Sequence, residues 1–233
     1  MELRLLLRNG ESLLVTFGIP IVLLVFFSLV DVLPHDERRP VTFLVPGVLA
    51  LSVMSASMVA LGIATGFERY YLVLKRLGAT PLRRGELVLA KVLAVAAVES
   101  VQILAVLAIA VLGLGYDPAS GRLWLAPLAV VLGTPAFAGI GLAMAGRLRA
   151  LATLGLVNAL YLALLLVGGI FVPLDRLPDP LAWIARLLPS AALTEVLRAA
   201  FGASTDGVAQ ALIVLSLWAV TAVAVAARTF RWE

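Results

Sequence analysis

The stretch from Glu68 to Glu86, ERYYLVLKRLGATPLRRGE, is the longest polar interruption in a chain otherwise built of apolar runs. It holds five of the chain's eighteen lysines and arginines. The apolar run on each side is long enough for a helix to cross a bilayer, which takes about 20 residues. The polar stretch therefore separates two membrane-spanning helices, and the rest of the sequence repeats this alternation.

The composition agrees with a membrane protein. Hydrophobic residues make up 62% of the 233 residues, charged residues make up 14%, and the mean hydropathy is +1.08. These values lie well above those of soluble domains. Because the apolar residues fall in long blocks instead of strictly alternating segments, helical spans fit and a β-barrel does not. The sequence predicts an all-α integral membrane protein with one domain over residues 1–233.

Six transmembrane helices fit this length, joined by short connections. Prolines such as Pro20 in the first span and Pro135 in the fourth lie inside the apolar runs, and membrane helices tolerate them because neighbouring groups satisfy the freed backbone. The predicted spans are Leu13–Leu33, Val41–Phe67, Leu87–Leu114, Leu123–Ala145, Leu151–Val172 and Val208–Ala227.

The second span carries small residues at four-residue spacing, including the pair Gly62 and Gly66. Such pairs let helix backbones approach closely in lipid. Packing within the subunit is the favoured interpretation, and a dimer seam is the alternative.

A segment between the fifth and sixth spans, Pro173–Gly207, is semi-apolar and broken by prolines. Asp179 followed by Pro180 predicts the start of a short helix that stops before Pro189. A second short helix is expected over about 190–200. The apolar spacing of Leu177, Leu181, Ile184 and Leu188 indicates an interfacial or re-entrant segment on the extracellular side.

The positive-inside rule orients the spans. With six spans both termini lie on one side, and that side carries twelve of the eighteen lysines and arginines, against six on the other. Lysine and arginine concentrate in cytoplasmic loops. We therefore expect both termini and the Glu68–Glu86 stretch in the cytoplasm.

Within that stretch an amphipathic helix is predicted. Tyr70, Val73, Leu74 and Leu77 would share its apolar face, with basic residues mostly opposite. Gly78 fits a left-handed residue after the helix, and Thr80 followed by Pro81 would start the next helix. The basic face would bind either anionic lipid headgroups or a cytoplasmic protein.

Two segments carry a family resemblance. KRLGATPLRRGELVLAK, Lys75–Lys91, resembles the coupling-helix segment of type-2 ATP-binding-cassette (ABC) permeases, which include drug, antibiotic and polysaccharide exporters. GGIFVPLDRLPDPLAWIARLLPSAALTEVLRAAF, Gly168–Phe201, is similar to the segment between that family's fifth and sixth spans. The family commonly has an acidic, Gly-Thr-containing run where this chain has Tyr70–Val73.

The resemblance implies a permease subunit of an exporter in the cytoplasmic membrane of a prokaryote. It would act as a homodimer or paired permease with two copies of an ABC ATPase subunit, which holds the ATP and magnesium. The implied ATPase-docking residues are Glu68, Arg69, Tyr70, Leu74, Lys75, Arg76 and Leu77, and the implied external gate is Phe171, Pro173 and Pro189. Consistently, neither lysine, Lys75 or Lys91, stands in a G-x-x-x-x-G-K-[ST] phosphate-binding loop.

Glu99 lies near the middle of the third span, where a charge is costly, and Gln102 is one turn away. Glu99 either lines a path for a cationic substrate or holds helices together by a hydrogen bond. Asn158 in the fifth span is a third candidate for the path. The substrate class implied is a small hydrophobic or amphipathic molecule: a drug, an antibiotic or a lipid-like compound.

Other classes have less support. The chain has no cysteine, and its single histidine, His35, sits in a charged loop, so no metal site or bound cofactor is expected. No catalytic constellation is present, which argues against an enzyme. No nucleic-acid partner is expected. A gradient-driven secondary transporter or channel is the alternative, although no inverted repeat supports it.

Overall fold

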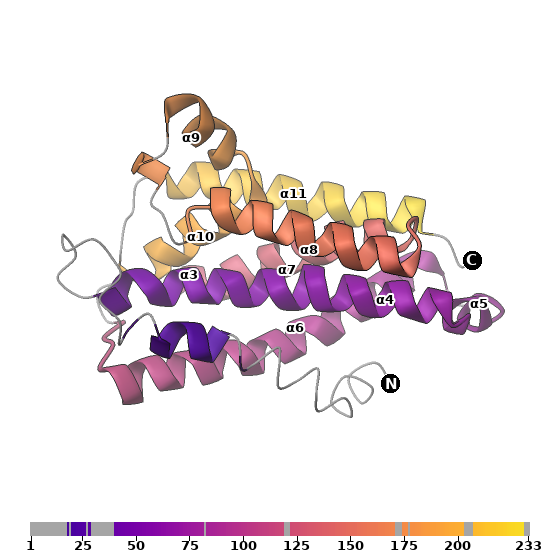
Figure 1. Cartoon of the computed structure of the whole chain (residues 1–233), viewed down its shortest axis with the longest axis horizontal. Helices are drawn as coiled ribbons and strands as arrows, with labels where there is room; N and C mark the ends of the chain where they lie inside the picture. Colours follow the sequence, from indigo (N-terminus) through magenta and orange to yellow (C-terminus); the bar gives the residue numbers. More distant parts are fainter. Residues whose placement is uncertain are drawn as a thin grey trace.

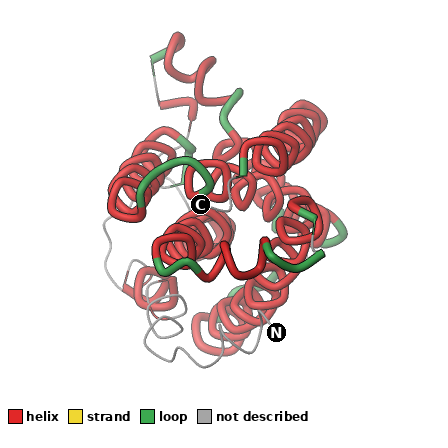
Figure 2. Tube along the Cα trace, turned by 90° about the vertical axis from the view of Figure 1, so that its right-hand side faces the viewer, coloured by secondary structure: helices red, strands yellow, loops and turns green. Residues whose placement is uncertain are grey.

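A computed structural model of the chain describes residues 18, 20–26, 28, 40–81, 83–118, 122–170, 174–176, 178–202 and 207–230. Over these ranges the chain is helical and contains no strand, which confirms the predicted all-α class. Figure 1 shows long helices lying side by side, and Figure 2 views the same bundle from one end. The elements are α3 (Pro40–Met54), η1 (Ser55–Ala60), α4 (Leu61–Tyr70), α5 (Val73–Gly78), α6 (Arg84–Ala108), η2 (Ile109–Gly113), α7 (Leu125–Ala145), α8 (Ala150–Val167), η3 (Leu174–Arg176), α9 (Asp179–Arg186), α10 (Pro189–Ala200) and α11 (Val208–Thr229).

Five helical stretches among the described residues are long and apolar enough to cross a membrane. They match the second to sixth predicted spans to within a few residues at each end. The first predicted span, Leu13–Leu33, falls largely outside the described residues, of which 20–26 are helical. The count of six spans therefore stays a prediction. The five stretches are Val41–Tyr70, Arg84–Gly113, Leu125–Ala145, Ala150–Val167 and Val208–Thr229.

The small residues of the second span pack inside the subunit. A Cβ atom on Gly62 would lie 3.2 Å from the Cα of Gly141 in α7, and a Cβ atom on Gly66 would lie 3.3 Å from the Cβ of Thr153 in α8. Both distances are tighter than ordinary van der Waals contact, so Gly62 meets the backbone of α7 and Gly66 meets the Thr153 side chain of α8. The favoured interpretation, packing within the subunit, is confirmed.

The middle of the second span is wound as a π-helix, η1, between α3 and α4. A Cβ atom on Gly141 would lie only 2.5 Å from the carbonyl oxygen of Met58 in η1. The absence of a side chain at Gly141 therefore lets α7 approach the widened turn. Single π-helical turns often mark functional positions in helices.

The segment between the fifth and sixth spans forms two short helices, as predicted. α9 starts at Asp179 with Pro180 in its first turn, and α10 runs from Pro189 to Ala200. The two differ in environment: α10 is buried against α3, α7 and α11, whereas α9 stands away from the bundle at the top of Figures 1 and 2. Of the predicted apolar face, Leu181 and Ile184 are exposed.

Candidate functional site

The Glu68–Glu86 stretch differs from its predicted form because one residue breaks the helix. Glu68, Arg69 and Tyr70 are the last residues of α4 and so extend the second span. Leu72 then adopts a left-handed conformation, with φ of 60°, and α5 begins at Val73. The predicted single helix from Glu68 to Leu77 is thus two helices joined at Tyr71 and Leu72.

Two further boundaries in this stretch are corrected. Gly78 ends α5 in the helical region instead of following it as a left-handed residue. The next helix begins at Arg84 with Arg83 as its first flanking residue, not after Thr80 and Pro81. The Glu86 carboxylate accepts a hydrogen bond from the Arg83 backbone N–H at 2.9 Å, so the capping interaction occurs three residues later than expected.

The break also splits the predicted apolar face. Leu74 is fully buried against Leu87 of α6 and Phe230, which follows α11. Leu77 packs on the edge of this cluster, whereas Tyr70 is 69% exposed and Val73 is 41% exposed. One leucine therefore anchors α5, which extends past the end of the second span in Figure 1.

Polar contacts join the same end of the bundle. The Lys91 Nζ of α6 lies 2.7 Å from the Glu68 Oε2 of α4, and the Lys91 side chain is 1% exposed. The Arg69 Nη1 donates a hydrogen bond to the Ala145 carbonyl oxygen of α7 at 3.0 Å. Together with the Leu74 cluster, these contacts connect α5 to α4, α6, α7 and the end of α11.

The side chains exposed at this end are a mixed aromatic and basic set. Tyr70 and Tyr71 meet edge to face, with ring centroids 5.2 Å apart, and Lys75 and Arg76 are exposed on α5. Tyr71 and Leu72 were not among the predicted site residues. The sequence offered no reason to select them. A leucine in the left-handed conformation is rare, and in a continuous helix Tyr71 and Leu72 would have pointed in different directions.

The second candidate region is a buried polar cluster around Glu99 of α6. The Thr134 hydroxyl of α7 donates a hydrogen bond to the Glu99 Oε2, and Ser57 of η1 also faces the carboxyl. Glu99 and Gln102 are fully buried, and the Glu99 Oε1 has no hydrogen-bond partner among the described residues. Thr134 and Ser57 are partners that the sequence pattern did not identify.

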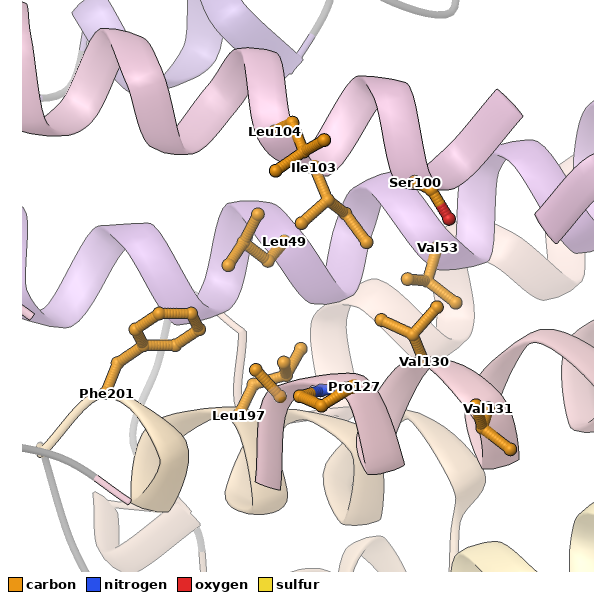
Figure 3. Close-up of a pocket in the computed structure, with 11 residues that line it drawn as sticks. Leu49, Val53, Ser100, Ile103, Leu104, Pro127, Val130, Val131, Leu197 and Phe201 are labelled. Carbon is orange, nitrogen blue, oxygen red and sulfur yellow. The ribbon is translucent and has the colours of Figure 1, made fainter. Parts of the chain in front are cut away.

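An apolar cavity of about 350 Å³ lies between α3, α6, α7 and α10 (Figure 3). Ser100 supplies the polar side chain of a lining that is otherwise apolar. The lining residues are Leu49, Val53, Ser100, Ile103, Leu104, Ala126, Pro127, Val130, Val131, Leu197 and Phe201.

The polar cluster lies one helical turn beyond this cavity on three helices. Each cluster residue is four positions from a cavity residue: Ser57 from Val53, Glu99 from Ile103, and Thr134 from Val130. Residues four apart share a helix face. Since α6 runs opposite to α3 and α7 in Figure 1, the three offsets point toward the same end of the bundle.

The remaining predicted site residues lie apart from this cluster. Asn158 is on α8, where its side-chain Nδ2 donates to the Leu154 carbonyl oxygen at 2.8 Å. Pro189 is buried as the first residue of α10. Phe171 and Pro173 lie outside the described residues. In the part of the chain that the structure describes, no group of three or more acidic, histidine or cysteine side chains is placed to hold a metal ion.

Comparison with known families gives one match. The family model for the ABC-2 type transporter matches residues 1–201, which is most of the 233-residue chain. No match to an individual curated protein was found.

Proposed function

The chain belongs to the ABC-2 type transporter family, and on that premise we propose that it is the membrane-spanning permease subunit of an ATP-driven exporter. The observation that carries the proposal is the family match over residues 1–201, on a multi-pass helical membrane protein. A phosphate-binding loop is absent from the printed sequence. We therefore assign ATP hydrolysis, with its magnesium, to a separate ATPase subunit present in two copies.

The proposed docking surface is α5 with the exposed turn before it. Lys75, Arg76 and, just before the turn, Tyr70 are exposed, whereas Glu68, Arg69 and Leu74 contact other helices of the chain. The predicted docking residues thus take two roles in the proposal. The exposed residues contact the ATPase, and the residues that contact other helices transmit the movement of the ATPase to α4, α6 and α7.

Charge reversal tests the docking surface. The variant Lys75→Glu/Arg76→Glu should lose ATPase co-purification and substrate-stimulated hydrolysis, because these charges lie on the proposed contact. Arg122→Glu is the matched control, since Arg122 is an exposed arginine beyond the opposite end of the spans, just before α7. Unchanged co-purification in the double variant would remove the docking role. If no ATPase co-purifies with the unaltered chain, the gradient-driven alternative is favoured.

The orientation and assembly are part of the proposal. We place the α5 end and both termini in the cytoplasm of a prokaryotic cell, because lysines and arginines concentrate at that end. The working unit is a homodimer or a pair of permease chains. The α9–α10 segment with Pro189 then lies on the external side, where the gate is proposed.

The substrate proposed is a small hydrophobic or amphipathic molecule. The apolar cavity suits a hydrophobic body, and Glu99 one turn below it suits a positively charged group. The Glu99 Oε1, which has no hydrogen-bond partner among the described residues, is the oxygen proposed to meet that positively charged group. Asn158, which is partly exposed on α8, is retained as a path residue.

Paired substitutions separate recognition from helix packing. Glu99→Gln keeps the shape and removes the ionisable group, so stimulation by a cationic amphiphile should fall while stimulation by a neutral analogue stays. Thr134→Val removes only the hydrogen-bond donor to Glu99 and serves as the control. Equal losses of thermal stability in both variants, with no discrimination between the two amphiphiles, would show that Glu99 only packs helices.

A further inference from the structure

A second cavity, of about 630 Å³, lies where the end of α4 meets the start of α8. It is separate from the apolar cavity of Figure 3, because no lining residue is shared. Its size falls within the range of about 300–1,000 Å³ that is usual for small-molecule sites. Its walls come from the last turn of α4 and the first turn of α8.

The charged residues that line this cavity are both basic. Arg69 and Arg149 both line it, and none of its lining residues is acidic. The bond from the Arg69 Nη1 to the Ala145 carbonyl oxygen holds that guanidinium at the wall, and a guanidinium carries five N–H donors. α8 also starts without a side-chain cap or an acidic residue in its first turn, so its first backbone N–H groups add positive potential.

The position of the two arginines matches the level of lipid headgroups. Arg69 is the last residue but one of the candidate span Val41–Tyr70, and Arg149 directly precedes the candidate span Ala150–Val167. The lining is otherwise apolar or aromatic, with Leu151 77% exposed and Tyr70 69% exposed at its edge. A ligand in this cavity would therefore have one part beside two guanidinium groups and another part against apolar side chains.

We propose that this cavity binds the phosphate headgroup of an anionic membrane phospholipid, with Arg69 and Arg149 on the phosphate and the acyl chains beside α8. Arginine pairs suit phosphate because the planar guanidinium presents parallel N–H donors. A lipid is favoured over a soluble partner because the cavity lies beside the spans, whereas α5 extends past them. The proposal does not depend on the identity of the ATPase or the substrate.

Native mass spectrometry of the purified full chain tests the site, with phosphatidylglycerol and phosphatidylcholine of the same acyl chains as probes. We expect preferential retention of phosphatidylglycerol, reduced about fivefold by Arg149→Gln and again by Arg69→Gln, the size expected for one basic residue near a membrane surface. Arg147→Gln is the matched control, because Arg147 is an exposed arginine of the same turn that does not line the cavity. Arg149→Gln stands alone if Arg69→Gln fails to fold.

Three results would overturn the proposal. Equal retention of both lipids would show that no headgroup is selected, and equal loss in Arg147→Gln would show a diffuse surface effect. Displacement of the bound lipid by soluble glycerol 3-phosphate at the same concentration would identify a free-anion site. Loss of ATPase co-purification in Arg149→Gln with lipid retention unchanged would assign the arginine to the subunit contact.

Discussion

Two short helices at opposite ends of the bundle, α5 and α9, differ in how they are held. α5 places Leu74 in a buried cluster with Leu87 and Phe230, and its flank carries the Glu68–Lys91 ion pair. α9 buries only Ala185 among its residues, leaves Trp183 exposed and is connected at its end by the Trp218 Nε1 hydrogen bond to the Leu187 carbonyl oxygen at 3.0 Å.

The difference shows that amphipathic spacing alone does not determine attachment. α9 has the clearer helical pattern, with apolar residues at regular spacing, yet most of its apolar surface faces away from the bundle. α5 is only six residues long but connects several spans through one leucine and its neighbours. We therefore expect a displacement of α5 to be transmitted to the spans more fully than a displacement of α9.

The largest expected effect comes from removing the anchor of α5. Leu74→Ala should lower the free energy of unfolding by about 2–5 kcal/mol, because it truncates a fully buried leucine. Ile184→Ala in α9 should change it by less than about 0.5 kcal/mol, because that side chain is exposed. Thermal unfolding of both variants in one detergent measures the difference. Similar decreases in melting temperature for the two variants would show that α5 and α9 are equally well attached to the bundle.

A smaller effect is expected from breaking the ion pair beside α5. Lys91→Met leaves the Glu68 carboxylate without its cation, and because Glu68 is 27% exposed the loss should be about 2 kcal/mol, less than for a fully buried pair. Lys91→Met/Glu68→Gln should recover most of that loss. Arg176→Met, at an exposed basic residue of η3 just before α9, should stay near the unaltered protein. No recovery in the double variant would show that Lys91 acts through packing.

The smallest effect, of opposite sign, is expected at the turn between α4 and α5. Leu72 is the only non-glycine residue with a positive φ in the described part of the chain. Leu72→Gly should raise stability by up to about 1 kcal/mol, because the relief of left-handed strain exceeds the backbone entropy of glycine. Val73→Gly, one residue later at the start of α5, should lower it by about 0.5 kcal/mol, because glycine is a poorer helix former than valine. Loss of stability in both variants would show that Leu72 is not strained.

The helices of the membrane domain could be predicted because long apolar runs have few alternatives in lipid. The prolines likewise located the starts of α9 and α10, since proline is favoured in the first turn of a helix, where its missing N–H costs no hydrogen bond. The break at Leu72 could not be predicted, because nothing in the sequence disfavours a helix there. It depends on Leu74 reaching Leu87 and Phe230, which are distant in sequence.

The candidate sites were predictable to a similar extent. Glu99 was recognisable because a charge within an apolar span needs a partner, and its burial with Gln102 follows from that need. Its partner Thr134 is adjacent to a proline in a different span, and only the packing of α6 on α7 brings the two together. Arg69 and Arg149 line the same cavity only because the end of α4 meets the start of α8, which the sequence does not indicate.

The glycines of α7 have a consequence for how this domain can change shape. α7 touches α11 at Gly139, where a Cβ atom would lie 2.5 Å from the Ala222 carbonyl carbon, and touches η1 at Gly141. A side chain at either glycine would push the helices apart, so the packing of α7 on both neighbours depends on these two positions. We therefore expect α7, α11 and η1 to move together, with any rearrangement concentrated at the borders of this group.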